Sequence, residues 1–114
     1  MNIMKKSEIN FTVELDENNL PNNIEWKASD ANEGGSTKSV MMSLWDVKEK
    51  NTMRIDLWTK DMLVDEMKMF YHQSMLSMAD SFERATGEAE MAKEMREFAQ
   101  HFGEKLQLIK RAGS

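Results

Sequence analysis

The side chains best suited to acid–base or metal chemistry in this sequence are its two histidines, His72 and His101. His72 falls in a helical pattern near the line of Asp65 and Glu83, but a metal site would need closer-spaced ligands, such as two histidines one turn apart. His101 follows Glu97 by one helical turn, a spacing typical of a surface ion pair. We expect both histidines to be packed or solvated, with no metal bound.

Nucleophilic and phosphate-binding motifs are also missing. Ser74, Ser77 and Ser81 lie in a helical pattern without the glycines of a nucleophile elbow. Gly34 and Gly35 lack the following lysine and the strand-to-helix context of a phosphate-binding loop. The chain has no cysteine, which excludes disulfides, thiolate zinc sites and thiol nucleophiles. The sequence therefore predicts a protein that is not an enzyme, with no catalytic residues and no cofactor.

Composition predicts one soluble domain spanning residues 1–114. Hydrophobic residues make up 40% of the 114 residues and charged residues 31%, enough for a core and for solubility. No apolar run reaches membrane length and the N-terminus has no signal-like apolar segment, so we expect a cytoplasmic protein without membrane insertion. The net charge of −5, with acids concentrated in residues 1–35, argues against a nucleic-acid partner.

Hydrophobic periodicity predicts the secondary structure. Period-two alternation indicates strands at about 7–15, 22–28, 38–47 and 52–58, and residues 29–37 read as an exposed loop. The period then changes to about 3.6, which predicts helices at about 64–85 and 88–110, with Gly87 as the stop between them. The expected fold is α+β: a four-stranded antiparallel β-sheet with two C-terminal α-helices on one face, in the order ββββαα.

A tight hairpin between the third and fourth strands predicts a two-sided surface. Closing it through residues 48–51 pairs Val47 with Thr52 and Trp45 with Arg54, and so places six apolar side chains on one face: Val40, Met42, Leu44, Met53, Ile55 and Leu57. Met41, Trp45 and Trp58 then fall on the opposite face. Exposed aromatic and methionine side chains mark binding surfaces, so this face is a candidate interaction surface. The alternatives are a different register or a covering loop or helix end.

Each predicted helix carries one main apolar stripe. The first stripe comprises Val64, Met67, Tyr71, Met75, Met78, Phe82 and Ala85, and the second comprises Met91, Met95, Phe98, Ala99, Phe102, Leu106 and Ile109. A lesser line on the first helix, Met62, Met69 and Leu76, extends the candidate interaction surface. Either the second helix or a partner subunit is expected to cover this line.

Several segments resemble the gliding motility-associated protein GldC family. They are residues 6–17 (KSEINFTVELDE), 43–46 (SLWD), 48–52 (KEKNT), 54–62 (RIDLWTKDM), 64–67 (VDEM) and 78–87 (MADSFERATG). The resemblance implies a small cytoplasmic accessory of gliding bacteria, associated with machinery that shares components with type IX secretion. It implies partners among the proteins of that machinery, and it carries over no catalytic residue because the family has no assigned reaction.

The element order also resembles that of the export chaperone SecB, a homotetramer that holds unfolded clients. This is an analogy of topology, which does not fix function. The leading hypothesis is a chaperone-like or adaptor module that binds other proteins. The alternative is a small-ligand-binding or enzymatic domain with a pocket between sheet and helices that uses Tyr71, His72 or Arg54. A scaffold built from a homodimer or homotetramer is the third hypothesis.

Overall fold

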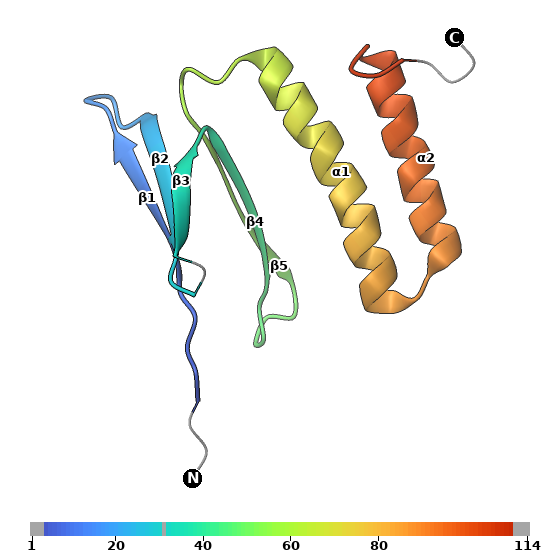
Figure 1. Cartoon of the computed structure of the whole chain (residues 1–114), viewed down its shortest axis with the longest axis horizontal. Helices are drawn as coiled ribbons and strands as arrows, with labels where there is room; N and C mark the ends of the chain where they lie inside the picture. Colours follow the sequence, from blue (N-terminus) through green and yellow to red (C-terminus); the bar gives the residue numbers. More distant parts are fainter. Residues whose placement is uncertain (1–3, 31, 111–114) are drawn as a thin grey trace. The chain divides into compact units, whose positions relative to one another are not determined.

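A computed structural model describes residues 4–30 and 32–110 and divides the chain into two compact units (Figure 1). The sheet unit ends at Met62 and the helical unit begins at Leu63. Five strands precede two helices, so the α+β class is confirmed. The expectation of one four-stranded sheet is wrong, because the strands form a three-stranded sheet and a two-stranded sheet. That the chain forms a single domain stays a prediction, and each unit is described by itself.

The first sheet contains β1 (Ile9–Leu15), β2 (Pro21–Ala28) and β3 (Glu33–Thr37), paired antiparallel in the order β1-β2-β3. The turn from β1 to β2 is built on Asp16, whose Oδ1 accepts the backbone N–H groups of Asn18 at 2.8 Å and Leu20 at 3.0 Å. Asn19 takes a left-handed conformation at φ 62°. The residue types account for this turn, since Asp and Asn stabilise a turn through their own side chains.

Strand β3 lies inside the segment that we predicted to be an exposed loop, and that prediction is wrong. Its sequence, EGGST, shows no apolar alternation. Glycine is needed here because the strands approach closely: a Cβ on Gly34 would lie 2.7 Å from the backbone oxygen of Trp26. Trp26 of β2 pairs with Gly35 of β3, and its indole lies beside that glycine. Position 34 of this strand therefore requires glycine, because a side chain there would collide with the backbone of β2.

The second sheet is a hairpin of β4 (Ser39–Trp45) and β5 (Thr52–Trp58). Trp45 pairs with Thr52 and Met42 with Ile55, so the observed register differs from the predicted one by two residues. The connection is longer than expected because the Asp46 carboxylate accepts the backbone N–H groups of Lys48 and Glu49. A shift of two preserves both faces of a strand, so the predicted division of side chains between the faces holds.

The two sheets are joined where β3 gives way to β4. Only Lys38 separates these strands, and its carbonyl oxygen accepts the Thr59 N–H at 2.8 Å. The next residue, Lys60, donates its N–H to the Pro21 oxygen at 3.0 Å and its Nζ forms an ion pair with Asp16 at 2.9 Å. The start of β2 and the end of β5 are thereby fixed to each other, which makes residues 4–62 one unit.

The helical unit is a hairpin of α1 (Val64–Thr86) and α2 (Ala89–Lys105). Glu66 opens α1 by accepting the Leu63 N–H at 2.9 Å, and Gly87 ends it at φ 74° as predicted. Helix α2 stops at Lys105, short of the predicted residue 110. The chain turns back there, because Gln107 is left-handed at φ 61° and Leu108 donates its N–H to the Gly103 oxygen at 2.8 Å.

Small residues form the contact between α1 and α2. Ala79, Ala92, Ala99 and Gly103 are buried, and His72 is buried with them. A Cβ on Gly103 would lie 2.7 Å from His72 Nε2, so glycine is what lets the imidazole lie against α2. Across the same contact, Arg96 forms ion pairs with Asp80 at 3.0 Å and Glu83 at 2.8 Å. We call this contact the small-residue seam.

The large apolar side chains of the helices lie off this seam. At about 100° per residue, the predicted main stripe of α1 is centred about a quarter turn from His72, and that of α2 is offset from Gly103 by a similar angle in the same sense. Because the helices are antiparallel, equal offsets put both stripes on one side of the two-helix layer. Phe98 is 58% exposed and Met78 is 53% exposed. Residues such as Phe98 and Met78 thus form an open apolar side, whereas Ala99 and Phe102 of the same α2 stripe lie at the helix–helix contact.

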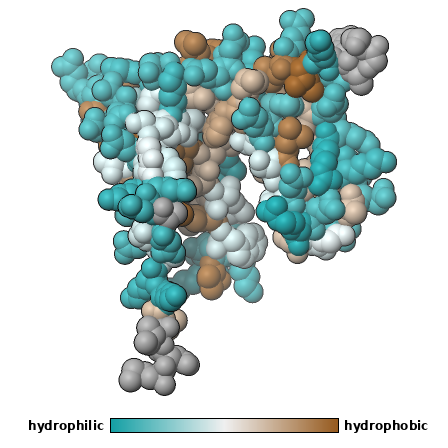
Figure 2. All heavy atoms as spheres, in the orientation of Figure 1, coloured by the Kyte–Doolittle hydropathy of each residue, from teal (hydrophilic) through white to brown (hydrophobic). Residues whose placement is uncertain are grey.

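The buried apolar core of each unit is small. Among the described residues, the buried hydrophobic side chains are Ile24 and Val40 in the sheet unit and three alanines in the helical unit. Figure 2 shows hydrophobic side chains at the surface of the sheet unit and of the helical unit. Each unit therefore presents apolar surface that its own residues do not cover.

Candidate functional site

The tryptophan face is the side of the β4–β5 hairpin that carries Met41, Ser43, Trp45, Thr52, Arg54, Asp56 and Trp58. The observed register assigns these residues to one face, because Met41 is opposite Asp56 and Ser43 is opposite Arg54. Trp45 is 67% exposed and Trp58 is 53% exposed, while Met41 is half-buried. The face that sequence periodicity predicted to be aromatic and open is formed in the structure.

The two tryptophans lie at opposite ends of this face. Trp45 pairs with Thr52 beside the turn, whereas Trp58 pairs with Ser39 beside the joint between the sheets. Six residues of strand separate positions 52 and 58, which corresponds to about 20 Å. Met41 is a diagonal neighbour of Trp58, so the structure brings these two together and leaves Trp45 apart. The tryptophan face therefore has two separate apolar ends, one at Trp45 and one at Trp58 with Met41.

A polar network fills the middle of the tryptophan face. The Arg54 guanidinium donates to Ser43 Oγ at 2.8 Å and forms an ion pair with Asp56 at 3.0 Å. Both charged side chains are exposed. A partner that covers this face would therefore need apolar groups at both ends and polar groups between them.

A shallow hollow of about 390 Å³ adjoins Trp58. It is lined by Leu20, Pro21, Asp56, Leu57, Trp58 and Lys60. Leu20 and Pro21 come from the β1–β2 turn, which the joint between the sheets holds beside β5. Sequence reasoning missed these two residues, although an exposed leucine within a polar turn was the available signal. The hollow is large enough to hold one apolar side chain.

The remaining predicted surface residues fall in different places. Met62 precedes α1 and lies in the connection, where its N–H donates to the Thr59 oxygen at 3.1 Å, so it is not on the helix as expected. Met69 and Leu76 lie on α1 within about 60° of His72 on a helical wheel, which places them beside the small-residue seam. Both side chains are nevertheless exposed, Met69 at 43% and Leu76 at 37%, so helix α2 does not bury this line.

The residues of the alternative ligand-pocket hypothesis have structural contacts. The His72 ring stacks on Phe102 with centroids 6.4 Å apart, and Arg54 belongs to the network with Ser43 and Asp56. Tyr71 is exposed and meets Phe70 edge to face. Within residues 4–30 and 32–110, no group of three or more His, Asp or Glu side chains is arranged to hold a metal ion.

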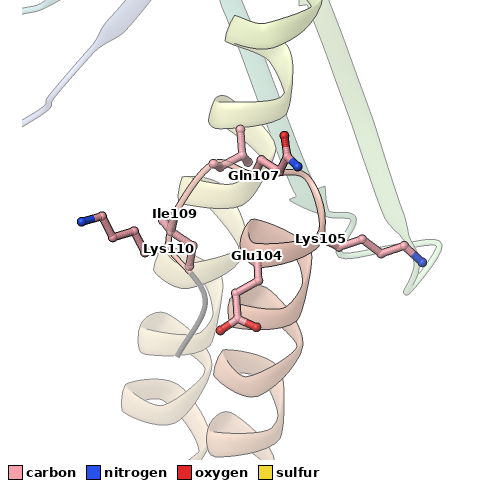
Figure 3. A pocket seen from close by; sticks show the side chains of 6 residues that line it. Glu104, Lys105, Gln107, Ile109 and Lys110 are labelled. Atoms are coloured by element: carbon pink, nitrogen blue, oxygen red, sulfur yellow. The ribbon is translucent and has the colours of Figure 1, made fainter. Parts of the chain in front are cut away.

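A larger hollow of about 540 Å³ lies at the end of α2 (Figure 3). It is lined by Glu104, Lys105, Gln107, Leu108, Ile109 and Lys110, and none of Tyr71, His72 and Arg54 contributes to it. In Figure 3 the side chains of Lys105 and Lys110 extend away from the turn in opposite directions. A ligand site needs polar groups that converge, and these groups diverge.

Together these observations define an α+β protein with an open aromatic sheet face and an open apolar side on its helical layer. The family model described as gliding motility-associated protein GldC-like matches residues 21–108, and the chain belongs to this family. No curated protein and no solved structure gives a significant match to the chain. None of the described helices is long and apolar enough to cross a membrane.

Proposed function

We propose that this gliding motility-associated protein is a non-enzymatic cytoplasmic accessory that binds other proteins, as an adaptor or chaperone-like module of the type IX secretion-linked motility machinery. Family membership supports the process. The observation that carries the binding role is the tryptophan face, with Trp45 67% exposed and Trp58 53% exposed. Large aromatic side chains are typical anchors of protein interfaces, and leaving two of them in water is unfavourable for an isolated chain.

The chemistry of the face favours a partner segment that is apolar at both ends and polar in the middle. Trp58 with its hollow and Trp45 are the two anchor points, and the Arg54–Asp56 pair lies between them. Anchors about 20 Å apart suit an extended segment of about six residues. Such a surface would suit either SecB-like client holding or adaptor binding. The two differ in whether the occupants are many unfolded chains or one defined protein.

A photocrosslinking experiment in gliding cells tests this proposal. A photoreactive amino acid replaces Trp45 in one strain and Val47 in a control strain, since Val47 is 88% exposed in the adjacent turn but lies outside the face. One crosslinked protein from position 45 indicates an adaptor, and a broad set of newly made chains indicates a chaperone. Equal crosslinking at both positions, or none at position 45, would contradict the proposed surface.

A cell-spreading assay adds the functional readout. Trp45→Ser combined with Trp58→Ser is expected to reduce gliding to the level of a strain lacking the protein, while Val47→Ser leaves it unchanged. The abundance and folded state of each variant are checked by immunoblotting and by far-UV circular dichroism. Normal gliding with a folded double variant would show that the tryptophan face is dispensable.

A further inference from the structure

The outer edge of β4 is the least protected strand edge in the described part of the chain. The strand reads SVMMSLW and carries no charged residue, whereas β1, β2, β3 and β5 each carry at least one. Proteins commonly protect exposed edges with charges or proline, because unpaired backbone groups otherwise recruit another strand. Strand β4 has neither, so its edge is suited to pairing.

The register identifies which backbone groups are unpaired. Asp46 donates its N–H to Asn51 and Thr59 donates its N–H to Lys38, so the even-numbered residues of β4 are the ones bonded to β5. Met41, Ser43 and Trp45 therefore direct their N–H and C=O groups outward. Within residues 4–30 and 32–110, no strand pairs with this edge.

Both ends of this unpaired stretch are closed. The Thr37 hydroxyl occupies the outward groups of Ser39, donating to its oxygen at 3.0 Å and accepting its N–H at 3.4 Å. At the other end the chain leaves the strand at Asp46, whose side chain is bonded in the turn. The free stretch is thus symmetric about Ser43, with one open residue on either side of it.

We propose that β4 pairs antiparallel with β4 of a second copy of this chain, on a two-fold axis through Ser43. Each copy offers the same three open residues, so every outward group finds a partner and the edge is used up in a closed dimer. Ser43 stands opposite Ser43 of the second copy, and Trp45 stands opposite Met41, a favourable sulfur–aromatic pair. No charged residue lies on either strand, so pairing brings no like charges together. This dimer does not depend on the proposed function and is tested without any other protein.

Because the chain has no cysteine, a single introduced cysteine reports the pairing. Residues that face each other as a hydrogen-bonded antiparallel pair have Cα atoms about 5.5 Å apart, within the range that a disulfide bridges. Ser43→Cys in the full chain is expected to form a covalent dimer under mild oxidation. Thr52→Cys is the matched control, since Thr52 lies on the same face but at the outer edge of β5.

An introduced charge provides the second test. Ser43→Glu keeps a favourable neighbour in Arg54 within the hairpin but sets two carboxylates opposite each other on the axis. We expect it to weaken the dimer by roughly tenfold or more, while Thr52→Glu changes the dissociation constant by less than about twofold. Light scattering across a dilution series measures the mass, and circular dichroism checks that each variant is folded.

The outcomes discriminate between occupants of the edge. A dimer that Ser43→Glu dissociates and Ser43→Cys locks supports the proposal. A wild-type monomer at all concentrations overturns it and leaves the edge to an extended segment of another protein. A dimer that is insensitive to Ser43→Glu, or that crosslinks equally through position 52, overturns it in favour of another surface, such as the open apolar side of the helices.

Discussion

The imidazole ring of His72 on α1 stacks on the phenyl ring of Phe102 on α2, with ring centroids 6.4 Å apart and planes 2° apart. The backbone beside the stack is Gly103, where a Cβ would lie 2.7 Å from His72 Nε2 and 3.0 Å from side-chain carbons of Ile109. His72, Gly103 and Ile109 of the C-terminal turn are thus tightly packed against one another. This tight packing makes the helical unit sensitive to a single methyl group.

Gly103→Ala is expected to destabilise the helical unit. Alanine favours a helix over glycine by up to about 1 kcal/mol, but overpacking costs about 1–3 kcal/mol, so we expect a net loss of about 1 kcal/mol. Thermal unfolding followed by far-UV circular dichroism measures the change, with exposed Lys93→Ala as the control. Combining the variant with His72→Ala should recover part of the loss. A more stable Gly103→Ala protein would show that the imidazole does not lie where the structure places it.

Gly34 and Gly35 are neighbours on β3, yet we expect them to respond differently to a methyl group. Gly34→Ala would set a Cβ 2.7 Å from the Trp26 backbone oxygen, which cannot move without disturbing β2. Gly35→Ala meets the Trp26 indole at 3.7 Å, an ordinary contact. All three tryptophans lie in the sheet unit, so tryptophan fluorescence, excited selectively over that of Tyr71, reports on this unit during denaturant unfolding. Equal stability of the two variants would contradict the strand assignment of β3.

Ile24 is the largest fully buried side chain among the described residues, and its truncation should be costly. Ile24→Ala is expected to lower the free energy of unfolding of the sheet unit by about 2–4 kcal/mol through lost burial and a cavity. Ile9→Ala, at a position that is 64% exposed, should change it by less than about 1 kcal/mol. If denaturant unfolding gives equal losses, the face that carries Ile9 is covered in solution.

Acid should weaken the joint between the sheets through Asp16. Hydrogen bonds from the Leu20 N–H and from Lys60 hold the pKa of Asp16 below its ordinary value of 3.8. A carboxylate with a lowered folded-state pKa stabilises the fold above the unfolded pKa and loses that contribution as the pH falls through the folded one. We therefore expect the free energy of unfolding of the sheet unit to decrease when the pH is lowered below about 4.

Asp16→Asn tests this assignment. The variant should be less stable than the wild type at neutral pH and should show a shallower loss of stability in acid, as measured by tryptophan fluorescence in denaturant at a series of pH values. Glu17→Gln, an exposed neighbour in the same turn, is the control for removing one charge. An unchanged acid slope in Asp16→Asn would assign the acid sensitivity to other carboxyl groups, such as Asp61, whose pKa a hydrogen bond from the Thr59 hydroxyl lowers.

Local signals predicted the elements whose side chains alternate. Strands β1 and β2, both faces of the β4–β5 hairpin and helix α1 follow from apolar periodicity, and the turn at Asp16 follows from its residue types. Strand β3 could not be predicted this way, because glycine has no side chain to show a period and the close approach of Trp26, which requires glycine at position 34, comes from another strand. The predicted register of the second hairpin was wrong because the Asp46 side chain stabilises a longer turn, which apolar alternation does not reveal.

Helix packing and the candidate site show where periodicity stops being informative. A hydrophobic stripe locates the large apolar side chains, but the contact between α1 and α2 uses alanine and glycine a quarter turn away. The tryptophan face was predicted because the alternation of side chains along a strand is enough to assign each residue to a face. The distance between Trp45 and Trp58 depends on the hairpin register that the Asp46 turn sets. The place of Leu20 and Pro21 beside Trp58 depends on the joint between the sheets, which no local pattern encodes.

In the small-residue seam, the residues that pack α1 against α2 are different from the large apolar residues that the layer exposes. Alanine and glycine hold α1 to α2, so the large residues on the open side, such as Phe98 and Met78, are not needed to hold the hairpin together. Substitutions there can alter the exposed surface of the layer without loosening the helix–helix contact, and substitutions in the seam can alter its rigidity without changing that surface. Evolution can thus change the exposed surface and the rigidity of the hairpin independently of each other.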